Sequence, residues 1–450
     1  MSSNCIGSGD WKKRLLVCST SYKGIILLMA ALFILRIGAT LHLGVTYGLG
    51  SDDLSYINSG IYFAKTGVIS MHSQEPSAQI MPGMTVFIGL MSMVFGEGKL
   101  LWAALKLVWA VMGTACAWYI YRSVSMFAPG WCGLVACLPL FRPDFIWTDS
   151  MILTETPFLL CLLAMVYYTL RMGQVKGGYR YFWLCLAAYM GGLMLKANIG
   201  LYPLFAFVYL LAVKYDIRLL LKQCVILACA VLCFVVPWSI RNYHHFDAFI
   251  PLTYGAGNPT LLGTYQGIGY PDDAALDYVT NVDEVVRERY AKYYGEDGNV
   301  LPQFQRYVAL EADGVKAAYR QKVWWDNDPK GFLVSYLLLK PQAILNSIFY
   351  WYPVYSINSA QLVDLPYLEI IGCIFTAVAA CVLKKYRAVI AFVLSVYIGH
   401  IYIYSMTFAF DRYGASLIYL RYIVLGIGLS LGIQLLLRGI RAVQQFEPTT

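Results

Sequence analysis

Apolar segments long enough to cross a lipid bilayer recur along this chain from residue 22 to residue 437. The hydrocarbon core of a bilayer is roughly 30 Å thick, and an α-helix needs about 20 mainly apolar residues to cross it. Hydrophobic residues make up 59% of the 450 residues and charged residues only 13%, which excludes an ordinary soluble domain. We therefore expect an all-α polytopic membrane protein, with residues 1–450 forming a single membrane domain.

The basic residues lie in short clusters between the apolar segments, a pattern typical of loops that face the cytoplasm. Segment length and these clusters together predict about ten transmembrane helices, with both termini in the cytoplasm. The first follows Lys12, Lys13 and Arg14 and has the length of a retained span rather than of a signal peptide. The predicted spans are 24–44, 100–121, 125–142, 152–170, 181–195, 199–213, 223–240, 366–383, 388–407 and 415–437.

Two long segments then face the outside. Residues 45–99 contain "MPGMTVFIGLMSMVFG", which is apolar but short for a span, so we expect a juxtamembrane helix at the outer interface. Residues 241–365 are predicted to be mostly helical, with soluble helices at 281–295 and 303–325 and an interfacial helix at 332–353. The glycine-rich run "YGAGNPTLLGTYQGIGYP" in the same segment predicts a flexible loop that closes over a ligand.

Two adjacent carboxylates, Asp52 and Asp53, open a predicted helix directly after the first span, and Tyr56 follows them at helical spacing. Carboxylates suit the start of a helix, but capping accounts for only one of them. A positioned carboxylate can take a proton from an acceptor hydroxyl. A pair of carboxylates can instead hold a divalent cation, and the sequence leaves both alternatives open.

Other polar residues, far apart in the sequence, are predicted to meet at the same outer boundary. They are His72, Asp149, Glu155, Lys196, Arg241, Asn242, Asp411 and Arg412. Arg36, inside the first span, needs a partner such as Asp149 or Glu155. Lys196 and Arg241 stand where cations suit a phosphate or a lipid headgroup. The histidines lack the spacing of a zinc site.

These features together resemble the GT-C superfamily of membrane glycosyltransferases. The similarity is greatest to the bacterial branch that includes relatives of dolichyl-phosphate-mannose protein mannosyltransferases and of the lipid A aminoarabinose transferase. The motifs that carry it are, in order, "SDDLSY", "MPGMTVFIGLMSMVFG", "LTETPFLL", "PWSIRN" and "DRY". Two positions depart from the family pattern: "QIMPGM" stands where a His-Pro-Pro or Lys-Pro-Pro run is frequent, and Asp53 stands where glutamate is common.

The resemblance implies an inverting glycosyltransferase that moves a sugar from a polyprenyl-phosphate-linked donor to a glycan, lipid, wall polymer or protein acceptor. The reaction would take place on the outer face of a bacterial plasma (inner) membrane. The resemblance implies Asp52 as catalytic base, with Asp53 as second choice, and Arg241 with Lys196 as contacts to the donor phosphate. It implies no cofactor beyond the donor, and it leaves a divalent metal open. Because the basic residues lie in short clusters rather than in one patch, we expect no nucleic-acid partner.

Three other classes of protein remain compatible with the sequence, and one of them is a non-catalytic accessory protein, because the sequence shows residue types and not geometry. A transporter or flippase for a lipid-linked or anionic substrate would use similar basic pockets, but it usually shows repeat symmetry and a site at the membrane midplane. An O-antigen ligase-like or polymerase-like enzyme also acts on the outer face. The acidic pair directly after the first span favours the transferase.

Overall fold

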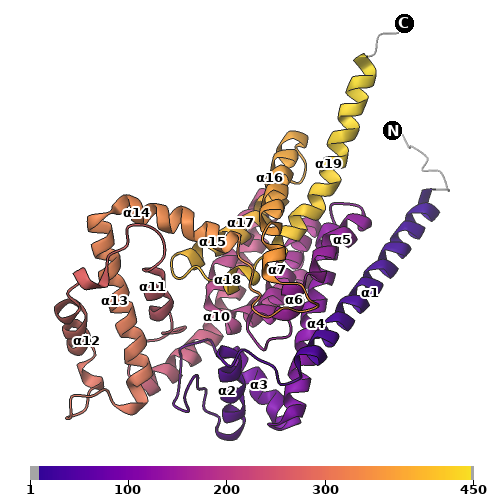
Figure 1. Cartoon of the computed structure of the whole chain (residues 1–450). Coiled ribbons are helices and arrows are strands. Elements are labelled where there is room, and N and C mark those ends of the chain that lie inside the picture. Colours follow the sequence, from indigo (N-terminus) through magenta and orange to yellow (C-terminus); the bar gives the residue numbers. More distant parts are fainter. Residues whose placement is uncertain (1–9, 447–450) are drawn as a thin grey trace.

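The structure, a computed structural model, describes residues 10–446, with side chains described for residues 22–440. Its described residues form helices joined by loops and turns, and three isolated bridges are the only β-pairing among them. The predicted all-α fold is therefore confirmed. Figure 1 shows a bundle of long helices from which a smaller helical lobe projects to one side. We call this part, which extends from α11 (Gly257–Gly263) to α14 (Pro329–Val334), the outer lobe.

Each of the ten predicted spans coincides with helical structure. Within residues 10–446, seven helices contain a stretch long and apolar enough to cross a membrane: α1 (Asp10–Leu43), α4 (Lys99–Val124), α7 (Glu155–Val175), α10 (Ile217–Phe246), α16 (Leu365–Leu383), α17 (Arg387–Ser405) and α19 (Tyr419–Phe446). The other three predicted spans are shorter: α5 (Gly130–Cys137) with η1 (Leu138–Phe141), α8 (Arg180–Leu195), and η2 (Ala197–Leu201) with α9 (Tyr202–Ala212). The chain is a multi-pass membrane protein.

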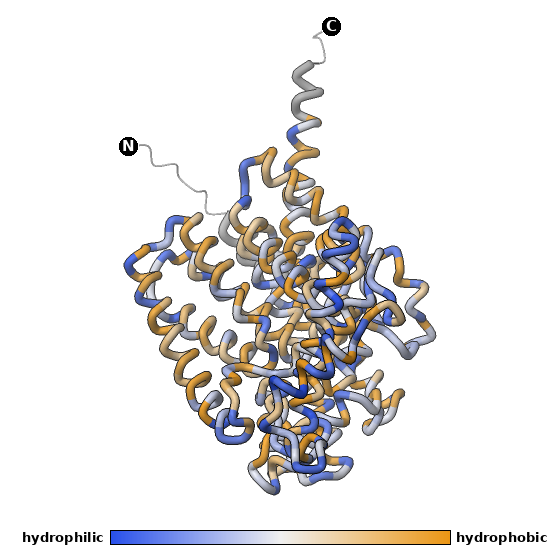
Figure 2. Tube along the Cα trace, turned by 90° about the vertical axis from the view of Figure 1, so that its left-hand side faces the viewer, coloured by the Kyte–Doolittle hydropathy of each residue, from blue (hydrophilic) through white to orange (hydrophobic). Residues whose placement is uncertain are grey.

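The two ends of the bundle carry different elements. Figure 1 shows α1 beginning and α19 ending on the same side of the bundle, opposite α2 (Asp52–Thr66) and α3 (Gly83–Phe95). In Figure 2, apolar helices run through the upper body of the view, and hydrophilic segments gather toward its lower end. The helix predicted in the segment 45–99 at "MPGMTVFIGLMSMVFG" is α3, which packs against α2 and α4.

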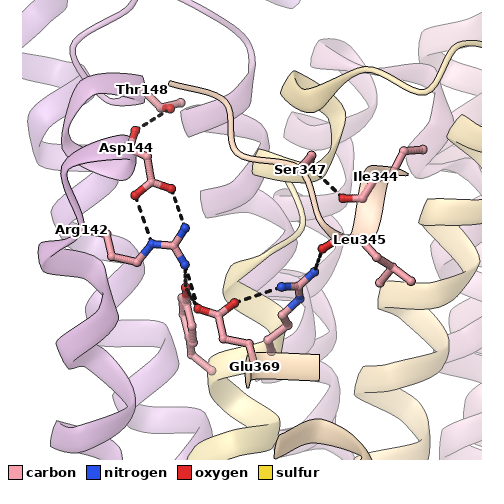
Figure 3. Close-up of polar contacts among 9 residues, drawn as sticks. Arg142, Asp144, Thr148, Ile344, Leu345, Ser347 and Glu369 are labelled. Carbon is pink, nitrogen blue, oxygen red and sulfur yellow. Dashed lines mark hydrogen bonds and ion pairs between the residues drawn. The ribbon is translucent and has the colours of Figure 1, made fainter. Parts of the chain in front are cut away.

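A buried ionic cluster fixes the point where the outer lobe rejoins the bundle (Figure 3). Arg142 Nη2 donates to Asp144 Oδ2 at 2.7 Å, and its Nη1 donates to Glu369 Oε1 at 2.8 Å. The other oxygen of Glu369 accepts from Arg421 at 3.0 Å, and Arg421 also donates to the backbone oxygen of Leu345. The cluster joins α6 (Pro143–Thr148), α16, α19 and the end of α15 (Lys340–Leu345). Separating these elements would leave buried charges uncompensated, so the cluster holds them together.

The outer lobe differs in part from the predicted helices. The helix predicted at 303–325 is α13 (Gln305–Asn327). The one predicted at 281–295 is broken into η4 (Val279–Asp283), α12 (Glu284–Arg289) and η5 (Ala291–Tyr293). The break follows from aromatic packing, since Tyr290 and Tyr293 both turn onto Tyr307 of α13, with ring centroids 6.2 and 5.4 Å away.

The predicted interfacial helix also ends early. It consists of α14 (Pro329–Val334), η7 (Ser335–Leu339) and α15, and it stops at Leu345 rather than at 353. The Tyr350 hydroxyl lies 3.1 and 2.8 Å from the backbone oxygens of Val354 and Ile357. These contacts hold the chain after α15 in an irregular turn, and the helix cannot continue.

Candidate functional site

A cavity of about 630 Å³ lies where the bundle meets the outer lobe. Part of its wall is charged and comes from Asp52, Glu155, Lys196, Arg306 and Arg412. Another part is apolar or aromatic and includes Leu262, Ile403, Phe408 and Tyr413. The cavity thus combines a charged surface with walls that suit a hydrocarbon chain.

Four of the charged side chains form one connected row. Arg412 donates from Nη1 to Asp52 Oδ2 at 2.6 Å and from Nε to Glu155 Oε1 at 2.8 Å. Lys196 Nζ donates to the same oxygen of Glu155 at 2.9 Å. Glu155 is 2% exposed, whereas the Asp52 side chain is 35% exposed. Asp52 is therefore the carboxylate that a ligand in the cavity can reach.

Local structure places each member of this row. Asp52 begins α2, and Glu155 begins α7, where the positive end of the helix dipole favours a carboxylate. Lys196 stands in extended conformation between α8 and η2, where the chain leaves the helix. Arg412 belongs to the short α18 (Asp411–Ala415), which lies between α17 and α19. Four segments distant in the sequence therefore supply one charged wall.

Electrostatics keep the cations of the row charged. Burial opposes the charge of Arg412, but Glu155, Tyr56 and Asp52 outweigh it and raise the pKa of Arg412 well above its usual range. Burial likewise opposes the charge of Lys196, and Glu155 reverses that effect and raises its pKa. Tyr56 is 5% exposed, and burial raises the pKa of its phenol. Its hydroxyl consequently stays protonated and can donate a hydrogen bond.

His72 stands beside the exposed carboxylate. Its Nε2 lies 3.8 Å from Asp52 Oδ1, and its Nδ1 lies 2.9 Å from Ser55 Oγ. The backbone of His72 is in the left-handed region, with φ of 61°, a conformation that non-glycine residues keep mainly where the surroundings enforce it. Burial lowers the pKa of His72, although Asp52 acts in the opposite direction, so the imidazole is neutral at neutral pH.

Asp53 points away from the cavity. Its side chain is fully buried, and its oxygens accept the backbone N–H groups of Leu49 at 2.6 Å and Ser51 at 3.0 Å. The two adjacent carboxylates thus have different surroundings: Asp53 closes the loop before α2, and Asp52 faces the cavity. Within residues 22–440, no group of three or more His, Cys, Asp or Glu side chains has the arrangement of a metal site.

Arg241 and Asn242, at the end of α10, also lie outside the cavity wall. Arg241 donates to the backbone oxygens of Ser77 at 2.9 Å and Ile69 at 3.1 Å. Asn242 is fully buried, and its amide donates to the backbone oxygen of Ile250 at 2.8 Å. These contacts fasten two loop segments to α10, so the structure gives Arg241 no position against a ligand in the cavity.

Asp149 and Asp411 complete the residues selected from the sequence. Asp149 accepts from Arg36 Nε and from the Thr156 hydroxyl, both at 2.7 Å, and this is one of the two partners considered for Arg36. It is buried inside the bundle, where Gly113 of α4 leaves room for it. Asp411 is exposed and does not line the cavity. The structure therefore gathers Asp52, Tyr56, His72, Glu155, Lys196 and Arg412, and leaves the other five outside.

Among the polar residues of the cavity wall that the sequence does not single out are Arg306, Asn198 and Tyr404. Arg306 of α13 reaches the wall and donates to Gln79 at 2.9 Å. The side-chain amide of Asn198 and the hydroxyl of Tyr404 are buried and have no hydrogen-bond partner among the described residues. Buried polar groups are normally paired, so these two side chains are exceptions. Part of the glycine-rich run also lines the cavity, as α11 (Gly257–Gly263) rather than as a flexible loop.

Comparisons with known proteins concern the fold of the chain. The family model described as dolichyl-phosphate-mannose-protein mannosyltransferase matches residues 76–240. The archaeal oligosaccharyltransferase AglB from Archaeoglobus fulgidus, solved in complex with an inhibitory peptide and a dolichol-phosphate, superposes with a TM-score of 0.54 at 12% identity. The chain has the GT-C fold. The alignment covers 95% of this chain and 52% of AglB, so the chain spans about half the length of that protein.

The GT-C resemblance that the sequence motifs predict is thereby confirmed. ArnT from Cupriavidus metallidurans, solved with undecaprenyl phosphate, aligns at 14% identity with a TM-score of 0.41, over 90% of this chain and 77% of its own. A search of curated protein sequences finds no match. At 12% identity the AglB structure establishes the fold alone, and the activity has to be argued from the site.

Proposed function

We propose that the protein is an inverting glycosyltransferase that moves a sugar from a polyprenyl-phosphate-linked donor to an acceptor hydroxyl on the outer face of the membrane. The observation that carries the proposal is one accessible carboxylate, Asp52, in a cavity that also gathers three cations and an apolar wall. The mannosyltransferase family match supports it. We assign the protein to a bacterial plasma membrane, with both termini in the cytoplasm.

The charge of the cavity matches such a donor. Lys196, Arg306 and Arg412 face two carboxylates, Asp52 and Glu155, which leaves one positive charge in excess. A sugar-phosphate-lipid diester carries one negative charge. Arg306 is the cation without a carboxylate partner among the described residues, so we assign the donor phosphate to Arg306 and Lys196, with Arg306 in the role that the resemblance gives to Arg241. Leu262, Ile403 and Phe408 would hold the first part of the lipid.

The reaction follows from these positions. The acceptor oxygen forms a bond to the anomeric carbon as the bond from that carbon to the phosphate oxygen breaks, and the electron pair goes to the phosphate. The hydroxyl proton goes to Asp52, whose Oδ2 is held by Arg412 while Oδ1 remains free of a close partner. The leaving lipid phosphate gains a negative charge, which Arg306 and Lys196 stabilise. A single displacement inverts the anomeric centre.

The unpaired polar groups of the wall have a place in this reaction. The Asn198 amide can both donate and accept hydrogen bonds. The ring of Tyr404 stacks on that of Tyr413, with ring centroids 4.4 Å apart, which holds the Tyr404 hydroxyl in place. Sugar hydroxyls offer the complementary groups. We assign these two side chains to the transferred sugar, whose binding would remove the cost, about 1–3 kcal/mol each, of leaving them unpaired.

The test is transfer of radiolabelled sugar to membrane extracts from a panel of polyprenyl-phosphate and polyprenyl-diphosphate sugars, with and without chelator. We expect transfer from a monophosphate-linked donor. Arg306→Gln lowers that transfer because the donor loses a charged contact. Arg287→Gln, an exposed arginine of α12 in the same lobe, serves as the matched control and leaves transfer unchanged.

Two results would contradict the proposal, and each would indicate a different function. Transfer only from diphosphate-linked glycans indicates the ligase-like or polymerase-like enzyme. Movement of a lipid-linked sugar across vesicles, with no transfer from any donor, indicates the transporter. Transfer that survives the chelator favours Asp52 acting as a base without a metal, whereas its loss indicates that the carboxylate holds a divalent cation.

A further inference from the structure

A second hollow, of about 420 Å³, follows the surface of α2 and meets the cavity at His72, which lines both. Ser55, Asn58, Tyr62 and Lys65 line it at intervals of three and four residues, which places them on one face of the helix. Ser73 and Gln74 supply the opposite side. We call this hollow the α2 groove.

The α2 groove is polar but almost neutral. Its lining is mainly hydroxyl and amide groups, and no carboxylate contributes to it. The one lysine, Lys65, is paired with Glu97 at 2.6 Å. The side chains of Asn58, Tyr62 and Gln74 make no hydrogen bond within residues 22–440. These groups therefore remain available to a ligand from solution.

This chemistry fits a saccharide. Sugar hydroxyls both donate and accept hydrogen bonds, as amides and hydroxyls do, and the ring of Tyr62 offers an apolar surface for a sugar face. A phosphorylated lipid headgroup would need free cations, and the groove has none outside the Lys65 pair. From Asp52 to Tyr62 the helix extends about 15 Å at 1.5 Å per residue, a length that a short oligosaccharide fills.

One end of the α2 groove lies next to Asp52, the carboxylate that we propose as the base. Because His72 lies between Ser55 and Asp52, a hydroxyl at this end of the groove is next to the free oxygen of Asp52. In Figure 1, α2 lies at the bottom of the view, and α11 and α17, which carry part of the apolar wall of the cavity, lie above it. An acceptor and a lipid-linked donor would thus approach Asp52 from different sides, as a single displacement requires.

We propose that the α2 groove is the acceptor site and that the acceptor is a saccharide. This inference rests on the proposed function and selects one acceptor class. A neighbouring hollow of about 310 Å³ includes Glu75, Gln303 and Arg306 and meets the cavity at Arg306, the donor-phosphate contact, rather than at Asp52. It is the less suitable route for an acceptor and supplies a matched control, Gln303.

The test is saturation-transfer NMR on the full chain in lipid nanodiscs, with soluble tetrasaccharides of glucose, mannose and N-acetylglucosamine as probes and a serine-containing peptide for comparison. We expect at least one tetrasaccharide to bind. The double variant Asn58→Ala/Tyr62→Ala weakens that binding at least tenfold, and Gln303→Ala changes it less than twofold. Asn58→Gln, which keeps the amide, retains part of the affinity.

Four results would overturn the inference. They are no saccharide binding, saccharide binding that the double variant leaves unchanged, loss of binding in Gln303→Ala instead, and binding of the peptide alone in the α2 groove. The transfer assay separates this failure from failure of the proposed function. If the double variant transfers sugar with an unchanged acceptor KM, the groove is not the acceptor site, but the protein is still a glycosyltransferase. If tetrasaccharides bind in the groove but no donor supports transfer, the groove is a saccharide site, but the proposed function is wrong.

Discussion

Replacing Arg412 by lysine tests whether one guanidinium must hold two carboxylates at once. Arg412 donates to Asp52 at 2.6 Å and to Glu155 at 2.8 Å from two different nitrogens. A lysine ammonium keeps the charge but lacks the planar fork, so it can serve only one of them well. A hydrogen bond to a charged group contributes about 1.5–3 kcal/mol. At about 1.4 kcal/mol per factor of ten, Arg412→Lys should lower kcat/KM roughly 10- to 100-fold.

The assay is sugar transfer at matched protein level, with donor and acceptor varied separately. Arg287→Lys, an exposed position of α12, is the control and should behave as wild type. Glu155 keeps its bond from Lys196 at 2.9 Å in the variant, so we expect the protein to remain folded, which thermal unfolding in detergent checks. Wild-type kcat/KM in a correctly folded Arg412→Lys protein would refute the reasoning that the fork orients Asp52.

Three further predictions concern burial and pH. Arg36→Met strands the buried charge of Asp149 and should destabilise the fold by about 3–5 kcal/mol, whereas Arg36→Met/Asp149→Leu should recover most of the melting temperature. Burial lowers the pKa of Lys340 to about 7; above that pH the unfolded chain binds a proton that the folded chain does not, so stability should rise with pH by up to about 1.4 kcal/mol per unit. Melting temperatures at pH 7–9 should lose this rise in Lys340→Met and keep it in Lys322→Met, an exposed control. Because the pKa of His72 is lowered, the imidazole should become protonated only in acid, where it draws Asp52 Oδ1 toward itself and lowers kcat/KM. If the pH profile of His72→Gln shows the same fall in kcat/KM in acid, His72 does not have this role.

The spans and the acidic start of α2 could be predicted because their signals are local. Apolar length, basic flanks and two aspartates after a span are all contained within a few dozen residues. The break in the helix at 290–293 could not be predicted, because it depends on the packing of Tyr307 from a different helix. The same holds for the ionic cluster around Glu369, whose partners come from four elements.

The charged character of the candidate site was predictable from the sequence, but the residues that form it only in part. Successive residues of a helix point in different directions, so one of Asp52 and Asp53 had to turn away from any cavity. Which one does so depends on Arg412, 360 positions away in the chain. Arg241 carries the same local signal as a phosphate ligand, yet it donates to the backbone oxygens of Ile69 and Ser77. Arg306, by contrast, lies on a polar helix that gives no sign of a site.

The most direct test of the account compares sugar transfer by wild type, Asp52→Asn and Asp53→Asn at matched expression. General-base catalysis contributes about 10²- to 10⁴-fold, so Asp52→Asn should lose transfer to that extent and keep its melting temperature. Asp53→Asn should have the opposite effects. Its melting temperature should fall, because two backbone N–H groups lose a charged acceptor, while the folded protein should still transfer sugar. An active Asp52→Asn enzyme beside a folded but inactive Asp53→Asn enzyme would contradict the assignment of Asp52 as the base.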